Sequence, residues 1–348
     1  MRKKLFFILL GASFAAGAVT HYLHMSTLVQ ILFSCIAVIL AAAFLGQATE
    51  SVAHYAGERL GGFLNATFGN AAELIIAIFL VKDGFYDMVK ASLTGAIIGN
   101  SLLVLGVSVL IGGMKFRTQS FNVKAAAHNA SLMLLAVIAL FVPATFVQSL
   151  TRAENEIFSL IVAGILITAY ILWLLFSMIT HKEDLADVGE ADHGEPLWTK
   201  SRSVVYLALA TVMVAFISEW LVGNLESFSH QFGLSELFVG AFLIAIIGNA
   251  AEHSAAVLLA MKNKIGASFE IAIGSSLQIA LFVAPLLIII SYFYGNTMNI
   301  IFTPYELAAI AVAVVISNSI SRDGSTNWYE GVLLIVVYLI LGIAFFLV

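Results

Sequence analysis

Residues 69–73 read Gly-Asn-Ala-Ala-Glu, and the same five residues return at positions 248–252, an offset of 179. Both copies lie inside apolar runs, where an ionisable side chain is costly and is rarely kept without a function. Five identical residues that include Asn and Glu are hard to attribute to chance, even in a chain rich in Ala and Gly. The repeated segment therefore predicts a chain built from two related halves.

The chain around this repeat is strongly apolar. Its 348 residues are 61% hydrophobic and 11% charged, whereas about a quarter of the residues of an ordinary soluble domain are charged. At about 20 apolar residues per crossing, this length has room for roughly ten to twelve transmembrane helices. The composition excludes a soluble enzyme and predicts an all-α polytopic membrane protein.

Eleven apolar runs are long enough to be transmembrane spans. The two motif copies fall in the third and eighth spans, five crossings apart, so they must cross the membrane in opposite directions. We predict an N-terminal helix (1–24), a first five-helix repeat (25–180), a linker (181–201) and an inverted second repeat (202–348), the plan of transporters with midplane sites. The predicted spans are 5–20, 27–53, 62–81, 89–112, 122–146, 156–179, 203–223, 236–260, 267–291, 304–320 and 330–348.

The basic residues predict the orientation. With the N-terminus inside, only Lys82, Lys90 and Arg152 lie outside, and Lys124 lies at the inner end of the fifth span. This asymmetry follows the positive-inside rule and predicts a protein with its C-terminus outside. Residues 1–19 also have features of a signal peptide, but we favour a retained first helix. The cytoplasmic basic residues are Arg2, Lys3, Lys4, Arg59, Lys115, Arg117, Lys182, Lys200, Arg202, Lys262, Lys264 and Arg322.

The linker is the one strongly hydrophilic stretch. Six carboxylates lie within thirteen of its residues, which fits a solvated connection between helices or a cytoplasmic segment that attracts or senses cations. The sequence leaves both interpretations open. These residues are Glu183, Asp184, Asp187, Glu190, Asp192 and Glu195.

The repeated motif has the chemistry of a cation site. Asn70 and Glu73, like Asn249 and Glu252, are three residues apart and share one face of a helix. Two antiparallel helices that cross there would bring two carboxylates and two amides together. The single cysteine, Cys35, cannot form a thiolate metal site, and oxygen ligands select hard cations.

Charge favours Ca²⁺ at this site, because two carboxylates neutralise one divalent ion and Ca²⁺ accepts six to eight oxygens in flexible geometry. Mn²⁺ remains an alternative. Without the cation, the two carboxylates repel each other in a poorly solvated place, which favours their protonation. Competition between protons and the cation is then the coupling mechanism. A purely structural role of Glu73 and Glu252 between helices is disfavoured, because neutral side chains usually serve that purpose.

Other polar residues in the spans are weaker candidates. Glu50 and His54 share a face of the second span and can relay protons or simply pair near its cytoplasmic end. Glu219 lies in the middle of the seventh span, which favours a function. His253 follows Glu252 and is interpreted as a packing or gating residue. His128 and Glu306 are isolated and favour helix packing.

A second related pair of segments follows the motifs, at residues 95–106 and 274–285. Asn100 pairs either with Gln278, at an offset of 178, or with Ser275, at an offset of 175, and the sequence leaves this open. Helix packing explains the glycines and serines, whereas Asn100 and Gln278 are candidates for amides that line the site.

These motifs carry a family resemblance. The two GNAAE copies, the segment GSSLQIALFVAP at 274–285 and the acidic linker resemble the cation/proton exchanger (CAX) family, over nearly the whole chain and with similarity to its bacterial Ca²⁺/H⁺ antiporters. The resemblance implies the cation/Ca²⁺ exchanger fold, with one extra N-terminal helix. It implies that Glu73 and Glu252 are the central cation-binding carboxylates. Asn70, Asn249 and Gln278 would line the site.

The resemblance also implies roles outside the centre. Glu50 and Glu219 match acidic residues along the family's ion pathway, and the acidic linker matches its acidic helix. Ala96 and Gly99 stand where the family usually has serines, which puts hydroxyl ligands from the fourth span in doubt. A homotrimer is expected from similar bacterial proteins.

The favoured function is export of Ca²⁺ in exchange for H⁺, with both ions as substrates and no cofactor. The alternatives in the same superfamily are a Na⁺/Ca²⁺ exchanger, which would need more ligands for Na⁺, and a Mn²⁺/H⁺ antiporter. A channel or an intramembrane enzyme does not explain the repeat. The chain has no HExxH zinc motif and no phosphate-binding GxxxxGK[ST] loop, and its net charge of −5 gives no nucleic-acid signal.

Overall fold

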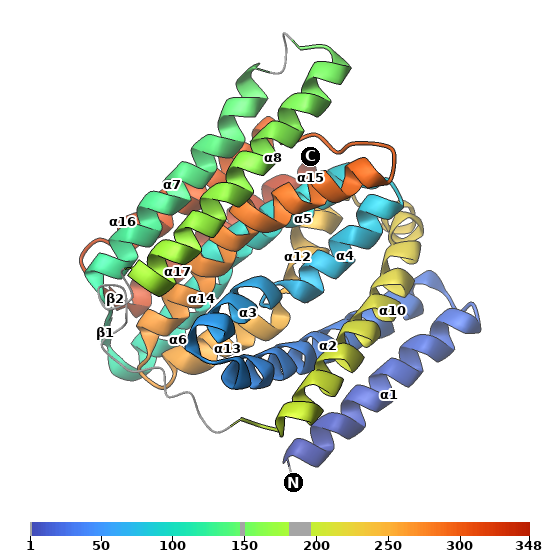
Figure 1. Ribbon diagram of the computed structural model, residues 1–348, viewed down its shortest axis with the longest axis horizontal. Coiled ribbons are helices and arrows are strands. Elements are labelled where there is room, and N and C mark those ends of the chain that lie inside the picture. Colours follow the sequence, from blue (N-terminus) through green and yellow to red (C-terminus); the bar gives the residue numbers. More distant parts are fainter. Residues whose placement is uncertain (1, 147–149, 181–195) are drawn as a thin grey trace.

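The computed structural model describes residues 2–146, 150–180 and 196–348. In these residues the chain is almost entirely helical, with one short antiparallel pair of strands (Figure 1). Each of the eleven predicted spans falls on helix, which confirms the all-α prediction. By length and composition, eight described helices can cross a membrane, or nine if a pair bent by 60° at Asn249 counts as one span.

The first half of the chain forms seven helices after the N-terminal one, two of which continue into π-helical segments. The elements are α1 (Arg2–Tyr22), α2 (Thr27–Ala56), α3 (Glu58–Phe68), α4 (Ala71–Lys82), α5 (Tyr86–Ile98), η1 (Gly99–Val104), α6 (Leu105–Phe116), β1 (Thr118–Ser120), α7 (Val123–Phe146), α8 (Arg152–Leu175) and η3 (Phe176–Thr180).

The second half repeats this order: a long helix, a helix broken in the middle, a helix with a π-helical segment, and two more helices. The elements are α10 (Lys200–Phe232), α11 (Glu236–Phe238), η4 (Val239–Ile244), α12 (Ala245–Gly248), α13 (Ala250–Ala260), α14 (Ile265–Gln278), η5 (Ile279–Val283), α15 (Ala284–Phe293), α16 (Pro304–Ile320), β2 (Ser325–Asn327) and α17 (Trp328–Leu347).

Three predicted spans differ from the helices observed. The eighth span, predicted at 236–260, bends by 60° at Asn249. The seventh span, predicted at 203–223, belongs to a helix of 33 residues that ends at Gly233, where φ is +62°. Its last turns are too polar for a hydropathy window to include them, yet they continue the helix. The third span, predicted at 62–81, is two helices, α3 and α4, separated at Gly69 and Asn70.

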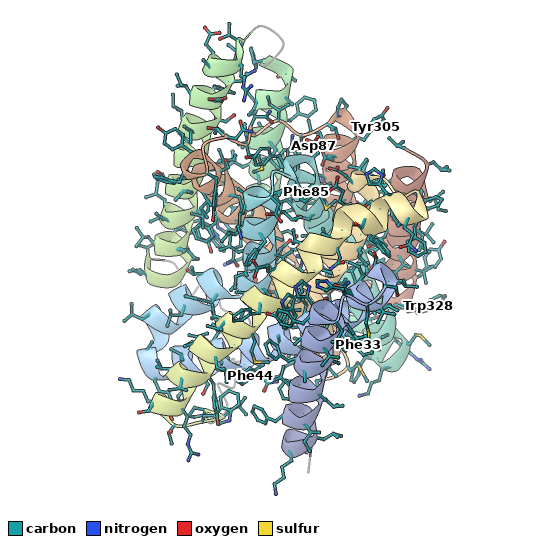
Figure 2. The ribbon with its side chains drawn as sticks, turned by 90° about the vertical axis from the view of Figure 1, so that its right-hand side faces the viewer. Phe33, Phe44, Phe85, Asp87, Tyr305 and Trp328 are labelled. Carbon is teal, nitrogen blue, oxygen red and sulfur yellow. The ribbon has the colours of Figure 1, made fainter. Side chains whose placement is uncertain are left out.

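The three helices α1, α2 and α10 form one side of the molecule (Figure 1). Helix α2 packs along α10, its counterpart in the second half, and α1 covers both. The buried residues of α2 include Ala37, Ala41 and Ala48, and such small residues allow helices to approach closely in a membrane. Figure 2 shows α1 and α10 toward the viewer, with side chains projecting outward from them.

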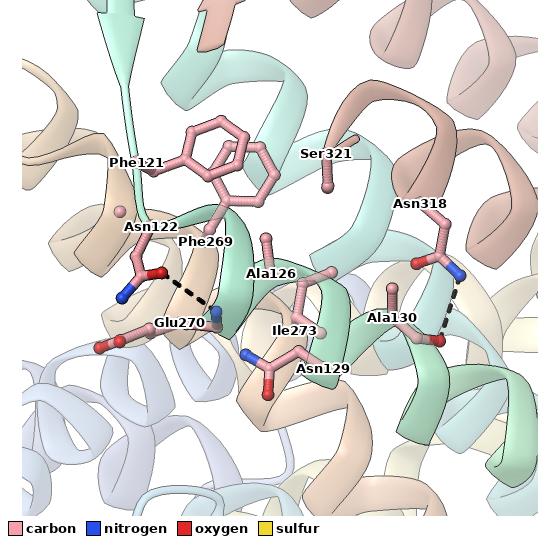
Figure 3. Close-up of a pocket in the computed structure, with 12 residues that line it drawn as sticks. Phe121, Asn122, Ala126, Asn129, Ala130, Phe269, Glu270, Ile273, Asn318 and Ser321 are labelled. Atoms are coloured by element: carbon pink, nitrogen blue, oxygen red, sulfur yellow. Dashed lines mark hydrogen bonds between the residues drawn. The ribbon is translucent and has the colours of Figure 1, made fainter. Parts of the chain in front are cut away.

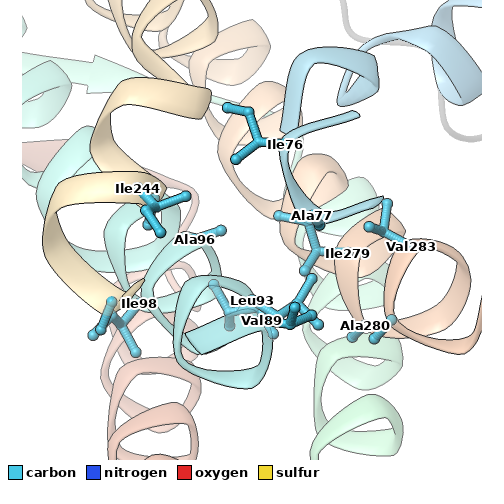
Figure 4. Packing of buried hydrophobic residues seen from close by; sticks show 14 of the residues in the cluster. Ile76, Ala77, Val89, Leu93, Ala96, Ile98, Ile244, Ile279, Ala280 and Val283 are labelled. Carbon is cyan, nitrogen blue, oxygen red and sulfur yellow. The ribbon is translucent and has the colours of Figure 1, made fainter. Parts of the chain in front are cut away.

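The buried hydrophobic core lies around the two helix breaks, between α3 and α4 and between α12 and α13. Ile76 of α4, Leu93 of α5, Ile244 of η4 and Ile279 of η5 come together there from both halves (Figure 4). Each is at most 1% exposed. This packing holds the two helix breaks next to each other in the middle of the molecule.

The two breaks have the same local geometry. Asn70 has φ −92° and ψ 22°, and Asn249 has φ −99° and ψ 4°, so each lies just outside the helix that follows it. The identical sequence of the two motifs thus gives the same interruption twice. Such a break frees backbone groups, which are tolerated at membrane depth only where protein or a cavity surrounds them.

The strand pair β1–β2 was not predicted, because three-residue strands leave no periodic pattern in the sequence. Thr118 pairs with Asn327, and Ser120 with Ser325. Between them, Nε2 of Gln119 donates hydrogen bonds to the carbonyl of Ala260, at 3.0 Å, and to Oδ1 of Asn263, at 2.9 Å. The strands therefore tie three connections together at one end of the helices.

Candidate cation and proton site

The two repeated motifs lie against each other, and the glycine of each copy faces the glutamate of the other. A Cβ atom on Gly69 would lie 3.2 Å from Oε1 of Glu252, and a Cβ atom on Gly248 would lie 3.5 Å from Cβ of Glu73. A methyl group at Gly69 would press against the Glu252 carboxylate, whereas one at Gly248 would make ordinary van der Waals contact with Glu73. The structure thus brings Glu73 and Glu252 together, as the sequence predicts.

The carboxylates of this pair are poorly satisfied. Glu73 is 1% exposed, and both of its carboxylate oxygens are buried without a hydrogen bond from any described residue. Glu252 is half-buried, and its Oε2 also has no hydrogen-bond partner among them. Burying an unpaired carboxylate is strongly unfavourable. A site of this kind therefore needs a bound cation or protons to balance its charge.

A chain of four polar side chains crosses the site. Oγ of Ser275 donates a hydrogen bond to Oδ1 of Asn70 at 2.8 Å, and Nδ2 of Asn100 donates to Oγ of Ser275 at 3.1 Å. Nε2 of His253 lies 3.1 Å from Oδ1 of Asn100. The chain joins both repeats and fixes the orientation of the Asn70 and Asn100 amides.

Two more predicted amides line the same place. Asn249 lies beside the Glu73 carboxylate, and its Nδ2 donates to the carbonyl of Ala245 at 3.0 Å. Gln278 is 6% exposed, and its Oε1 would lie 3.8 Å from a Cβ atom on Gly69. Its Nε2 is buried without a partner among the described residues. The amide oxygens here are neutral ligands that a hard cation accepts.

The helix boundaries favour one of the two pairings that the sequence leaves open. Helix α5, before Asn100, begins at Tyr86, and α14, which ends at Gln278, begins at Ile265, 179 residues later. Both helices then pass into π-helical segments. This offset is nearer to the 178 of the Asn100–Gln278 pairing than to the 175 of the Asn100–Ser275 pairing, and it places Gln278 opposite Gly99. Ser275 is the hydrogen-bond partner of Asn100 rather than its counterpart.

The remaining predicted pathway residues lie outside this network. Glu50 and His54 are exposed near the end of α2. The Glu219 side chain is 54% exposed, and its Oε1 lies 3.8 Å from Nζ of Lys82 at the end of α4. Among the described residues, the structure does not connect these side chains to the central carboxylates by hydrogen bonds.

Structural roles account for the isolated polar residues, as the sequence favours. Oε2 of Glu306 accepts hydrogen bonds from the backbone N–H of Thr303, at 2.7 Å, and from its hydroxyl, at 2.8 Å. This is a capping box at the start of α16. The ring of His128 stacks on Phe176.

The acidic linker from Glu183 to Glu195 lies outside the described residues. Within them, no three His, Cys, Asp or Glu side chains form a group that could hold a metal ion. A cation between Glu73 and Glu252 must therefore take its other ligands from amides, hydroxyls, backbone carbonyls or water.

The two halves are packed differently around the site. Gly95 of α5 lies directly against the backbone of Ala241 in η4, and a Cβ atom on Gly240 would lie 2.6 Å from the carbonyl oxygen of Met88. Helix α3, the counterpart of η4, lies instead on α2, with Gly61 against the carbonyl of Ala53. Gly69 is accordingly exposed, and Gly248 is buried.

Comparison with known proteins gives whole-chain matches. The sequence profile of the sodium/calcium exchanger protein family matches residues 26–179 and 202–347. The Ca²⁺/H⁺ antiporter ChaA of Bacillus subtilis (strain 168) is 43% identical over 350 residues, which cover 99% of both chains. The structure of native YfkE, 41% identical, has a TM-score of 0.87 and covers 99% of this chain and 100% of its own. The structure of the H⁺/Ca²⁺ exchanger CAX has a TM-score of 0.76, covers 100% of this chain and 93% of its own, and at 15% identity shows the fold alone.

Proposed function

Because the chain belongs to the sodium/calcium exchanger protein family, we propose that it is an antiporter that exports Ca²⁺ from the cytoplasm in exchange for H⁺. The resemblance to cation/proton exchangers that the sequence predicts is confirmed, and the fold is the cation/Ca²⁺ exchanger fold. The chain is a multi-pass membrane transporter. The direction of transport, the roles of single residues and the assembly are parts of the proposal.

The observation that carries the proposal is the meeting of Glu73 and Glu252. Their side chains come from symmetric breaks in two helices, and three of their four carboxylate oxygens are buried without a hydrogen bond from a described residue. One Ca²⁺ or two H⁺ would neutralise this pair equally. Since the two substrates need the same oxygens, the site holds either one or the other. That exclusion couples Ca²⁺ export to H⁺ entry.

The unequal packing of the two halves supports alternating access. The close contact between α5 and η4 seals one side of the site, whereas α3 leaves Gly69 exposed on the other. With the N-terminus in the cytoplasm, the open side is the cytoplasmic one. A cation would then reach Glu252 from the cytoplasm, and release on the outside would need α5 and η4 to separate.

The rest of the arrangement follows from the sequence. We place the protein in the plasma membrane, with the N-terminus inside and the C-terminus outside. It consists of a helix (1–24), two inverted repeats (25–180 and 202–348) and an acidic cytoplasmic linker (181–201) that attracts or senses cations. The two-part family match supports this division. Glu50 and Glu219 are placed along the ion pathway, and a homotrimer is the expected assembly.

The test is ion flux in liposomes that contain the purified protein and a pH-sensitive dye in the lumen. With the cytoplasmic face outward, an outward proton gradient should drive uptake of radioactive Ca²⁺, and added Ca²⁺ should raise the pH of the lumen. The direction of the pH change identifies protons as the counter-ion. Protein-free liposomes and liposomes whose proton gradient has been dissipated are the controls.

Replacement of the ions separates the alternatives. If Mn²⁺ produces a larger change in lumenal pH than Ca²⁺ does, the protein is a Mn²⁺/H⁺ antiporter. A Na⁺ gradient at clamped pH drives uptake only in a Na⁺/Ca²⁺ exchanger. Ca²⁺ flux with no movement of H⁺ or Na⁺ would indicate a channel and would contradict the proposal.

A further inference from the structure

One face of α14 carries a carboxylate that the sequence analysis did not single out. Glu270, Gly274 and Gln278 are spaced four residues apart, so they lie in one row along the helix. At 1.5 Å per residue, Glu270 is about 12 Å along the helix axis from Gln278. The row therefore leads from the beginning of α14 to the central site.

The corresponding face of α5 shows what this row is for. Because α5 and α14 begin 179 residues apart, Gly274 corresponds to Gly95, and Glu270 corresponds to Ala91. Gly95 lies against the backbone of Ala241, and Cβ of Ala91 lies 2.7 Å from the position of a Cβ atom on Gly240. In the first repeat, then, this face is covered by η4 and is closed.

In the second repeat the same face is open. No atom of the described residues lies within 4 Å of a Cβ atom on Gly274, which is half-buried. Helix α3, which corresponds to η4, lies on α2 through Gly61. This row is therefore uncovered at Gly274, and a path along it would lead to the buried Gln278 and to Glu252.

The beginning of this path is polar. Glu270 is exposed and lines a small cavity. Asn122, which directly precedes α7, and Asn129 of α7 line the same cavity. Figure 3 shows the three polar side chains along the lower edge of the cavity in that view, below the stacked rings of Phe121 and Phe269. Oδ1 of Asn122 accepts hydrogen bonds from the backbone N–H groups of Lys124 and Ala125 at the start of α7. The Glu270 carboxylate and the Asn129 amide oxygen are ligands that a hydrated Ca²⁺ accepts while it keeps part of its water.

We propose that Glu270 is a cation-binding residue of the cytoplasmic access path, where it binds Ca²⁺ weakly before the ion moves along α14 to Gln278 and Glu252. This inference rests on the proposed function, because it takes Ca²⁺ as the substrate and the open side as the cytoplasmic one. A single carboxylate attracts the ion without holding it, since two negative charges are needed to neutralise a divalent cation. Glu270 therefore sets how readily Ca²⁺ is captured, while the central pair sets whether it is transported.

The first experiment compares Ca²⁺ uptake into everted vesicles by the native protein and by Glu270→Gln. Removal of one charge along the path should raise the KM for Ca²⁺ about fivefold at low ionic strength, as expected for a divalent ion at about 8 Å in a water-like medium. The maximal rate should stay within about twofold, and the KM difference should shrink at about 1 M salt, where charges are screened beyond about 3 Å. Glu270→Asp keeps the charge and should keep the native KM.

The matched control is Asp323→Asn. Asp323 is exposed in the connection between α16 and β2, on the same predicted side of the membrane, and its Oδ1 accepts a hydrogen bond from the backbone N–H of Ser325, which Asn can replace. This variant loses the same charge away from the path and should keep the native KM. An unchanged KM in Glu270→Gln, or an equal rise in Asp323→Asn, overturns the inference. Absence of uptake by the native protein would instead contradict the proposed function.

A second experiment tests the path without measuring transport. In a Cys35→Ala background, Gly274→Cys should react with a charged thiol reagent added on the cytoplasmic side, and Ca²⁺ should slow the reaction. Ala272→Cys is the control, because Ala272 is 0% exposed on the opposite face of the same helix. Equal reactivity of the two cysteines, or reaction of Gly274→Cys from the outer side alone, would overturn the inference.

Discussion

Oγ of Ser275 donates a 2.8 Å hydrogen bond to Oδ1 of Asn70, across the interface between the two repeats. The same hydroxyl accepts a hydrogen bond from Nδ2 of Asn100. Because Oδ1 of Asn70 accepts this bond, its orientation relative to Glu73, three residues along the chain, is fixed. The hydroxyl of one serine therefore orients amides on two other helices at the candidate site.

Ser275→Ala should weaken Ca²⁺ transport without unfolding the protein. The substitution leaves the Asn70 oxygen and the Asn100 amide without their partner in a buried place, which costs about 1–3 kcal/mol. We expect the KM for Ca²⁺ to rise about tenfold, since 1.4 kcal/mol corresponds to a factor of ten. Ser276→Ala is the control, because its hydroxyl donates to Ala272 in its own helix and lies 3.5 Å from the hydroxyl of Ser101, so it orients no amide of the site. Equal effects of the two variants would show that packing, and not amide orientation, matters.

Glu73→Gln and Glu252→Gln should each abolish proton-coupled Ca²⁺ uptake. Each variant keeps the shape of the side chain but leaves only one carboxylate to balance a divalent cation. Removing one partner of a buried pair of opposite charges, here a carboxylate and the cation, costs about 3–5 kcal/mol. We expect a loss of more than about 100-fold in uptake by everted vesicles at equal protein levels. Glu156→Gln, at a half-buried residue of α8 in an ion pair with Arg152, should transport normally. Native uptake by both motif variants would exclude the pair from the mechanism.

Much of the fold could be predicted from the sequence because apolar length and a repeated motif are strong signals. The identical residues at 69–73 and 248–252 predicted both related halves, and the structure brings the two copies into contact. The break in each motif is indicated by its glycine, Gly69 or Gly248, and not by hydropathy, which is continuous across residues 62–81. The polar end of α10, up to Phe232, was missed because its polar residues lower the hydropathy of any window that includes them.

The candidate site was predicted where a residue type is rare in its surroundings. Glu73 and Glu252 stand out among apolar neighbours, whereas Ser275 is one of many serines on helices, and its role depends on a contact with Asn70 that no spacing reveals. Glu270 is a carboxylate near a helix end, so its place on the access path appears only when α14 is compared with α5. Glu219 is in the middle of an apolar run but lies at the surface beside Lys82.

Gly95→Ala should disturb the closed side of the protein. A methyl group at this position would collide with the backbone of Ala241, and overpacking of this kind costs about 1–3 kcal/mol. We expect a lower melting temperature in detergent. The control is Gly99→Ala, four residues later on the same helix, where no described atom lies within 4 Å of the added methyl group. An unchanged melting temperature in Gly95→Ala would contradict the close contact.

Glu306→Ala should lower stability but leave the transport mechanism intact. Its carboxylate caps α16 by accepting hydrogen bonds from Thr303, and loss of such a cap costs about 1 kcal/mol. We expect less folded protein with a native KM for Ca²⁺ per folded molecule. Glu306→Gln keeps an oxygen acceptor and should restore much of the stability. A large increase in KM with either variant would place Glu306 among the ion-binding residues.

The dependence of Ca²⁺ affinity on pH tests whether the two substrates share the central carboxylates. Protons that occupy Glu73 and Glu252 must leave before Ca²⁺ binds, so lowering the pH on the cytoplasmic face should raise the KM for Ca²⁺ while saturating Ca²⁺ restores the rate. Where both carboxylates are protonated, exchange of two protons for one Ca²⁺ predicts a rise of about 100-fold per pH unit, and exchange of one proton predicts about tenfold. The slope of log KM against pH in liposomes therefore counts the protons displaced. A KM that does not change with pH would mean that H⁺ binds elsewhere, and the buried, unpaired oxygens of Glu73 would then need another partner.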